Sequence, residues 1–452
     1  MLRQLAARQP LLYPLLLDSA ATGPLSEASV LLAAPSAALW LDRDGRLGAE
    51  GMTPRGPGFL TALENWWRSE RSPAASGEGD AGQYCGGWAV FLGYELAGEI
   101  EPHLALPPTP LPWQAFALRT HGALVLDLKS SRVFAVADEA GVLGRLLADA
   151  TAAARDRVAP EHLRIDSVHE EEAQTYLWRV RRAKEYVRAG DIYQANLSRP
   201  WDVRIRAAEK DGGGTDDEGP GVAAALYERL CAANPAPFAA LAQWQGVAIL
   251  SSSPERLVRV DGRRVDTRPI AGTRPRSRDP ARERGEMREL AAHPKERAEH
   301  IMLIDLERND LGRVCEAGTV RVDELMTIES YQHVHHIVSN VTGVLRPEVT
   351  PIGAVRALFP GGTITGCPKF RCMQIIAELE GEGRGAYTGS LGYLTREGRL
   401  DLNILIRTMT LRGRALSFRA GAGIVADSDP ERELEETRAK ARGLLAALEG
   451  PP

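Results

Sequence analysis

The spacing of hydrophobic positions divides the chain into two regions. Before residue 167, apolar residues form short alternating or continuous runs, for example over 122–128 and 132–138, and each run has the length of one strand. Beyond it, apolar residues at helical spacing, followed by a glycine, predict a helix over 170–189. Further helices are predicted over 295–306, 351–358, 368–379 and 430–448. Further strands are predicted over 192–198, 247–252, 257–260, 335–344, 390–394, 404–411 and 415–420.

The predicted strands outnumber the helices and often come in pairs, which indicates an α+β fold with helices packed outside large antiparallel sheets. The apolar run over 11–17 predicts a buried first strand and not a secretory signal, because Pro14 interrupts it and Asp18 closes it. Residues 207–221 contain no large apolar side chain, so we expect an insertion there. The arginine-rich run over 268–284 lacks aromatic residues and is expected to be a charged surface loop.

The composition is that of a globular protein. Of the 452 residues, 44% are hydrophobic and 25% are charged, which disfavours an intrinsically disordered chain. Lys plus Arg number 55 and Asp plus Glu number 60, so the formal charge of −5 argues against a generic nucleic-acid binder. No apolar stretch reaches the ~18 residues of a membrane span. The five cysteines form no CxxC pair, and we expect a cytoplasmic protein without nucleic-acid or membrane partners.

Two pairs of glutamates give the strongest chemical signal. Glu296 and Glu299 lie three residues apart in one predicted helix, and this spacing places both carboxylates on one side of it. Glu433 and Glu436 repeat the spacing in the C-terminal helix, which Asp429 can cap. Four converging carboxylates repel each other, and a divalent cation such as Mg²⁺ resolves that conflict. For either pair alone, a solvated acidic helix face is the alternative.

Three histidines lie close together near the strand predicted over 335–344. On a strand, His333 and His335 share one face and His336 takes the other. Since no cysteine or further histidine lies at zinc-ligand spacing, a structural zinc site is not expected. A single catalytic histidine on one face is compatible with the pattern.

The segment from 171 to 448 resembles the chorismate-binding catalytic domain shared by anthranilate synthase component I, aminodeoxychorismate synthase component I, and the isochorismate and salicylate synthases. The motifs that carry the resemblance are GDIYQANLS (190–198), SPERL (253–257), PIAGT (269–273), ERAEHIMLIDLERNDLGR (296–313), HHIVS (335–339), FPGGTITGCPK (359–369), LDLNILIRT (400–408) and GAGIVADSDPERELEETRAKA (421–441). The resemblance divides the chain into a family-type N-terminal region, 1–165, and a catalytic domain, 170–448. It implies a layered α/β/β/α fold with two packed, mainly antiparallel sheets and outer helices.

The same resemblance assigns roles to single residues. Glu299 and Glu436 bind Mg²⁺, supported by Glu296 and Glu433, and the ion holds the ring carboxylate of chorismate. The enolpyruvyl carboxylate is expected to meet Tyr387, Arg407, Lys440 and the backbone amides of Gly421 and Gly423. Gly272, Thr273 and Thr363 are expected to line the ring pocket.

Three further residues relate to the reaction itself. Glu255 matches the family's general acid and needs a raised pKa to stay protonated at neutral pH. His336 matches the family's histidine, which orients groups or shuttles protons. Gln194 stands where water-using relatives carry a lysine base, which argues against isochorismate or salicylate synthesis.

Within the family, the motifs YQANLS, PGG, HH before IVS, and DLN favour the aminodeoxychorismate synthase component I (PabB) branch, which serves p-aminobenzoate and folate biosynthesis. Its product is 4-amino-4-deoxychorismate. Many members of that branch carry a nucleophilic lysine where this chain has Ala271, and a methyl group cannot act as a nucleophile. PIAGT is the form usual in anthranilate synthase component I, so conversion of chorismate to anthranilate, for tryptophan biosynthesis, is the alternative.

The chain lacks a glutaminase cysteine motif with its downstream histidine. Because free ammonia is scarce at neutral pH, we expect a separate glutamine amidotransferase subunit that delivers it. Ser19, Pro237 and Phe238 match the family's tryptophan pocket, and ordinary core packing is the alternative for these residues.

Overall fold

The computed structural model describes residues 1–452 except 22, 24, 26, 73–85, 156–162, 207–219, 277–278, 332–333 and 450–452. His333 and most of the insertion expected over 207–221 therefore lie outside the described residues. The last two residues of that expected insertion already belong to a helix, α6 (Pro220–Ala233).

The other helices are α1 (Leu2–Arg8), α2 (Phe59–Glu70), α3 (Ala97–Ile100), α4 (Ala140–Arg155), α5 (Ala173–Ala189), α7 (Pro280–Ala292), α8 (Pro294–Gly312), α9 (Pro351–Leu358), α10 (Lys369–Glu380), α11 (Pro430–Glu449) and the 3₁₀ turns η2 (Tyr94–Leu96) and η3 (Gly362–Ile364). The strands are β1 (Leu15–Asp18), β2 (Ala28–Asp42), β3 (Leu47–Glu50), β4 (Gly87–Leu92), β5 (Trp113–Asp127), β6 (Arg132–Ala137), β7 (Arg164–Glu170), β8 (Gln194–Arg206), β9 (Phe238–Trp244), β10 (Val247–Ser253), β11 (Arg256–Asp261), β12 (Arg264–Arg268), β13 (Ile270–Pro275), β14 (Arg321–Ser330), β15 (Val334–Val344), β16 (Gly366–Cys367), β17 (Ser390–Thr395), β18 (Leu400–Asn403), β19 (Thr408–Arg412) and β20 (Ala415–Ile424).

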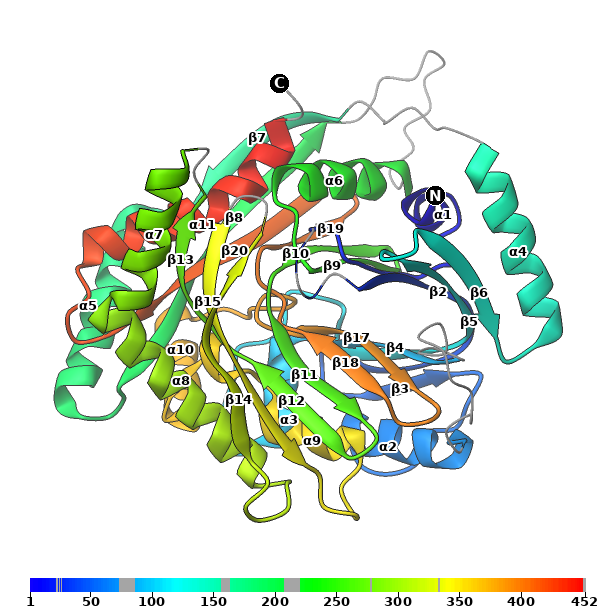
Figure 1. Cartoon of the computed structure of the whole chain (residues 1–452), viewed down its shortest axis with the longest axis horizontal. Helices are drawn as coiled ribbons and strands as arrows, with labels where there is room; N and C mark the ends of the chain where they lie inside the picture. Colours follow the sequence, from blue (N-terminus) through cyan, green and yellow to red (C-terminus); the bar gives the residue numbers. More distant parts are fainter. Residues whose placement is uncertain are drawn as a thin grey trace.

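Every described strand pairing is antiparallel. The strands follow each other in the order β7-β8-β20-β19-β10-β9-β1-β2-β5-β4-β17-β18-β11-β12-β15-β14. Strands of the N-terminal region lie inside this order, because β1 pairs with β9 and β4 pairs with β17. The two regions distinguished in the sequence therefore share one hydrogen-bonded system (Figure 1).

The long ribbon of strands folds into two halves that face each other. Aromatic side chains pack between the halves, and the rings of Phe91, Trp113, Phe116 and Trp244 lie 4.8–5.8 Å apart in successive contacts. On the outside, α1, α4, α6 and α11 pack against one half, and α2 and α9 pack against the other (Figure 1). Burial of apolar surface on both sides of each layer stabilises the arrangement. The predicted α+β fold with layers α/β/β/α is confirmed.

Local predictions fail at two places. The strand predicted over 404–411 begins only at Thr408, because Arg407 has a φ of 51° and turns the backbone out of extended geometry. The run over 268–284 is not a charged surface loop: it forms the end of β12, strand β13 and the start of α7. Several of its arginines are held in ion pairs, for example Arg268 with Glu329 at 2.5 Å.

The N-terminus combines a helix with the expected strand. Leu2 and Leu5 of α1 are buried against α6, and the strand expected over 11–17 forms as β1 from Leu15 to Asp18. None of the described helices combines the length and the apolar character needed to cross a membrane.

Candidate active site

Glu255 lies in the turn between β10 and β11, and its side chain is buried. Ser253 fixes the turn, because its hydroxyl accepts a hydrogen bond from the Glu255 amide at 3.2 Å. Burial raises the pKa of Glu255 to about 7, although the Thr363 hydroxyl and the Ile270 backbone favour the ionised form. Oε1 of this carboxyl has no hydrogen-bond partner within the protein. Near neutral pH the buried carboxyl of Glu255 can therefore hold a proton.

The guanidinium of Arg407 lies near this carboxyl, on the loop between β18 and β19. Arg407 is a non-glycine residue with a positive φ, a backbone conformation that costs energy and often marks functional positions. Burial lowers its pKa, and the charge of Glu255 opposes that effect. The strained loop thus places a half-buried cation beside a buried acid.

His335 and His336 point to opposite faces of β15, as predicted. His335 meets Glu283 at 3.2 Å and Ser330 at 2.7 Å, away from the buried acid. Burial and the nearby Arg407 lower the pKa of His336 to about 3, and the ring also meets the backbone of Gly272. His336 is consequently a neutral imidazole at physiological pH.

Strand β20 ends beside several of the residues singled out in the sequence. A Cβ on Gly421 would lie 2.7 Å from the hydroxyl oxygen of Tyr387, and a Cβ on Gly423 would lie 2.7 Å from Nε2 of Gln194. The two glycines thus let both side chains approach the strand backbone closely. From α11, Nζ of Lys440 donates to the Gly421 carbonyl at 3.0 Å.

The loop before α10 supplies Thr363, which lies in the turn η3. Its carbonyl oxygen accepts a hydrogen bond from the Asn196 amide at 3.3 Å, which ties the turn to β8. Its hydroxyl and Oδ1 of Asn196 are buried without a hydrogen-bond partner within the protein. Polar atoms left without partners inside a protein are costly, so this surface is suited to a polar ligand.

The two glutamate pairs lie on separate helices, α8 and α11. Oε1 of Glu296 bonds Nη1 of Arg274 at 2.8 Å, while its buried Oε2 makes no hydrogen bond. Glu296 also lies directly over Gly272, where a Cβ would meet its Oε2 at 2.6 Å. On α11, Glu433 is buried and Glu436 pairs with Lys440 at 2.7 Å. Carboxylate oxygens, one of them unsatisfied, are ligands that suit Mg²⁺.

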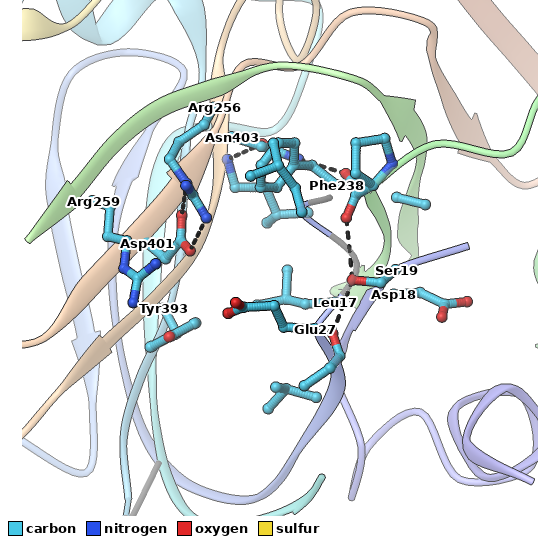
Figure 2. Close-up of a pocket in the computed structure, with 16 residues that line it drawn as sticks. Leu17, Asp18, Ser19, Glu27, Phe238, Arg256, Arg259, Tyr393, Asp401 and Asn403 are labelled. Carbon is cyan, nitrogen blue, oxygen red and sulfur yellow. Dashed lines mark hydrogen bonds and ion pairs between the residues drawn. The ribbon is translucent and has the colours of Figure 1, made fainter. Parts of the chain in front are cut away.

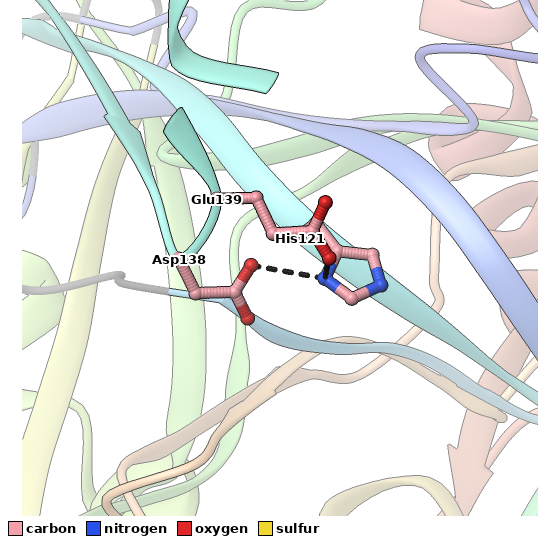
Figure 3. A group of neighbouring side chains, drawn as sticks. All are labelled: His121, Asp138 and Glu139. Atoms are coloured by element: carbon pink, nitrogen blue, oxygen red, sulfur yellow. Dashed lines mark hydrogen bonds and ion pairs between the residues drawn. The ribbon is translucent and has the colours of Figure 1, made fainter. Parts of the chain in front are cut away.

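The four glutamates do not close around one point. In the part of the chain that the structure describes, only His121, Asp138 and Glu139 bring three potential ligand atoms within 4.8 Å of one another (Figure 3). His121 lies on β5, while Asp138 and Glu139 lie in the turn between β6 and α4. Asp138 is already paired with Arg119 at 2.8 Å. An ion shared by α8 and α11 therefore requires their side chains to turn toward each other.

Two buried residues of α8 were not singled out in the sequence. The imidazole of His300 lies 2.7 Å from the Ser339 hydroxyl, and burial lowers its pKa to about 4. Burial also raises the pKa of Glu307 to about 7. Helical spacing puts Glu296, His300 and Glu307 on one face of α8, and that periodicity is the signal that could have found them.

The residues assigned to a tryptophan pocket do line one cavity, which lies apart from Glu255 between β1–β2 and β9–β11 (Figure 2). The Ser19 hydroxyl, which lies 2.9 Å from the Ala28 carbonyl, is also 3.3 Å from the Pro237 carbonyl oxygen. On the opposite side, Arg256 binds Asp401 through two hydrogen bonds of 3.0 Å each. The site is a preformed cavity with both apolar and charged walls.

Residues 48–446 match the sequence profile of a family described as chorismate binding enzyme. An anthranilate synthase component I-like protein of Synechocystis sp. is 42% identical over 367 residues, which cover 81% of this chain and 73% of that protein. The aminodeoxychorismate synthase of Streptomyces griseus is 40% identical over 380 residues, covering 80% of this chain and 50% of that protein. The structure of anthranilate synthase component I from Streptococcus pneumoniae is similar with a TM-score of 0.77 at 28% identity, covering 92% of both chains.

Proposed function

The chain belongs to the chorismate-binding enzymes, and we propose that it catalyses the magnesium-dependent amination of chorismate to 4-amino-4-deoxychorismate. The observation that carries this proposal is the buried Glu255, whose pKa of about 7 lets it hold a proton beside the cation of Arg407. A hydroxyl group leaves a ring only when it is protonated. A buried acid with a pKa near neutrality supplies that proton at physiological pH.

In the proposed reaction, Glu255 gives its proton to the hydroxyl at ring carbon C4, which leaves as water. The Thr363 hydroxyl lies near the same carboxyl and favours its ionised form. His336, neutral because of its burial, offers a ring nitrogen for a hydrogen bond without adding charge. Overall, one chorismate and one ammonia give one aminodeoxychorismate and one water.

Binding of a dianion calls for cations at the site. Arg407 and Lys440 supply two, and Tyr387 and the end of β20 at Gly421 lie beside Lys440. Mg²⁺, held by Glu296, Glu299, Glu433 and Glu436, would neutralise the ring carboxylate. Without such an ion, the glutamates would repel the substrate.

Ammonia is the nucleophile in this proposal. Ala271 on β13 offers no nucleophilic atom, so the amine attacks the ring directly. The amide of Gln194 is not a base that can activate water, which favours amination over hydration. We propose a separate glutamine amidotransferase subunit as the source of ammonia.

Anthranilate formation is the second candidate. Ala271 favours it, since PIAGT is the form usual in anthranilate synthase component I. Two of the similar proteins described above are anthranilate synthase component I or a protein like it. In that reaction, amination at ring carbon C2 is followed by loss of pyruvate.

Product analysis tests the proposal. The purified chain is incubated with chorismate, Mg²⁺ and ammonium at alkaline pH, with aminodeoxychorismate lyase added to convert any aminodeoxychorismate to p-aminobenzoate. We expect chorismate to be consumed and p-aminobenzoate to form. Anthranilate alone would replace the first candidate by the second, and unchanged chorismate would refute both in favour of a catalytically inactive binding subunit.

A further inference from the structure

Glu307 is a buried carboxyl that the proposed reaction has not used. It lies on the inner face of α8 and is 3% exposed. Its Oε2 has no hydrogen-bond partner within the protein. A carboxyl buried in this way is costly unless it is protonated or serves a function.

Glu307 and Glu255 are held by the same two segments of the chain. The amide of Gly362 lies 3.4 Å from Oε1 of Glu307, and the next residue, Thr363, faces Glu255. On the other side, Thr267 at the end of β12 lies near Glu307, and Ile270 at the start of β13 lies near Glu255. The two carboxyls are therefore neighbours, with Glu307 on the side of α8.

A pair of charged residues connects Glu307 to the surface. Asp310, almost one helical turn further along α8, is ion-paired with Lys369, whose Nζ also donates to the Leu358 carbonyl at 3.0 Å. Asp310 and Lys369 both line an open groove on the outer side of α8, together with the exposed Tyr193 and Ile301. Titratable groups thus run from this groove through Glu307 to Glu255.

We propose that Glu307 is a positioning residue that reprotonates Glu255 after each turnover and takes its own proton from the groove at Asp310 and Lys369. The inference rests on the proposed function, in which Glu255 is the general acid. While chorismate is bound, Glu255 faces the substrate and not water. A proton route on the side of α8 lets Glu255 regain its proton.

The proton transfers balance. Glu255 loses a proton to the departing hydroxyl and becomes a carboxylate, and water leaves. The carboxyl of Glu307 then gives its proton to Glu255, and the resulting Glu307 carboxylate takes one from the Asp310–Lys369 pair, which regains it from water in the groove. The ammonium formed on the ring loses one proton to bulk water, so each cycle consumes no net proton.

The charges around both carboxyls favour such exchange. Lys369 favours the ionised form of Glu307, and Asp310 disfavours that form. Lys440 favours the ionised form of Glu255, and Glu307 disfavours that form. Arg407 is a further cation near Glu255. The pKa of each carboxyl is about 7, and a proton passes readily between groups of matched pKa.

The test compares Glu307→Gln with the wild type in the ammonia-dependent assay of the full chain. Glutamine keeps the shape but carries no transferable proton. We expect kcat to fall by about 10-fold or more, with KM for chorismate changed by less than about 2-fold, and imidazole buffer, which is partly protonated near neutral pH, to restore part of kcat. The alkaline limb of the pH profile should also move to lower pH. Glu307 opposes the ionised form of Glu255, so without it Glu255 loses its proton at lower pH, and reprotonation from outside slows further as the pH rises.

Two further variants complete the test. Glu435→Gln, which makes the same chemical change at a side chain 66% exposed on α11, is the matched control and should behave as the wild type. Glu307→Asp should retain part of kcat, and it serves as the test variant if Glu307→Gln does not fold. An unchanged kcat in Glu307→Gln, or a loss that weak acids cannot restore, would overturn the relay. If the wild type fails to consume chorismate, the proposed function itself fails, and that result is distinct from a relay failure.

Discussion

Nζ of Lys440 lies 2.7 Å from Oε1 of Glu436, one turn earlier on α11, and it also donates to the Gly421 carbonyl at 3.0 Å. The ammonium group therefore holds one of the proposed Mg²⁺ ligands and, at the same time, touches the strand end where we expect a substrate carboxylate. A Mg²⁺ ion bound there as proposed would compete with the ammonium for the same oxygen of Glu436. Arrival of the ion would free Lys440 to meet the substrate.

Replacing Lys440 by methionine should separate these two effects. Lys440→Met keeps the length of the side chain and removes its charge, so Mg²⁺ loses a competitor and should bind more tightly. Chorismate loses a charged partner worth about 1.5–3 kcal/mol, so KM should rise by about 10-fold or more. Initial rates measured against both concentrations test this, and an unchanged KM would contradict the assigned role of Lys440.

Gly272 allows Glu296 to approach β13. Gly272→Ala would place a methyl group 2.6 Å from Oε2 of Glu296 at a φ of 65°, so we expect loss of Mg²⁺-dependent turnover together with lower stability. Gly262→Ala is the matched control, because Gly262 has a φ of 60° and open space around it. The control should lose only the ~1–2 kcal/mol of backbone strain and keep its turnover. Equal turnover in both variants would show that the close approach of Glu296 to Gly272 does not affect turnover.

The buried acid makes stability depend on pH. The pKa of Glu255 is raised from 4.5 to about 7, so the folded state holds a proton that the unfolded state releases. Its contribution to stability is complete below about pH 4.5 and is lost as pH rises through 7. The buried His300 and His336, whose pKa values are lowered, titrate with the opposite sign, so the wild type must be compared with Glu255→Gln. Denaturant unfolding should show a wild-type advantage that is larger at pH 5 than at pH 8, and a pH-independent difference would contradict the raised pKa.

The cavity at Ser19 should bind L-tryptophan. The cavity is lined by the apolar side chain of Phe238 and by charged side chains such as Arg256 and Asp401 (Figure 2). An aromatic amino acid has both an apolar ring and charged groups, so this lining suits it. At 100 times its Kd, a ligand of the folded state adds about 2.7 kcal/mol of stability. We expect L-tryptophan, but not L-leucine, to raise Tm, and Ser19→Phe to abolish the effect by filling the cavity. The absence of any shift with the wild type would leave the cavity as core packing.

Elements with clear local signals were predictable from the sequence. Asp429 caps α11 as expected, with its carboxylate accepting from the Arg432 amide at 3.0 Å, and α9 begins and ends at the predicted residues. Gly190 ends α5 with a φ of 81°, as its position indicated. Capping groups and glycine conformations act within a few residues, so a sequence displays them directly.

Features that depend on distant contacts were not predictable. The left-handed backbone of Arg407 is maintained by its surroundings and ends the predicted strand early. The burial of Glu307 depends on Thr267 and Gly362, which are remote in sequence, so its raised pKa has no local signature. The position of Glu255 was recognised from the SPERL motif, but its burial follows only from the fold.

The most direct test of the central claim compares Glu436→Gln with Glu435→Gln. Both substitutions remove one negative charge from the same turn of α11, but Glu435 is 66% exposed and pairs with Arg438, while Glu436 is a proposed Mg²⁺ ligand. The measurement is chorismate consumption against Mg²⁺ concentration, with circular dichroism to establish that both variants are folded. We predict that Glu435→Gln keeps the wild-type Mg²⁺ dependence and that Glu436→Gln loses Mg²⁺-dependent turnover. Full Mg²⁺-dependent activity in Glu436→Gln would contradict an ion held between the two acidic helices.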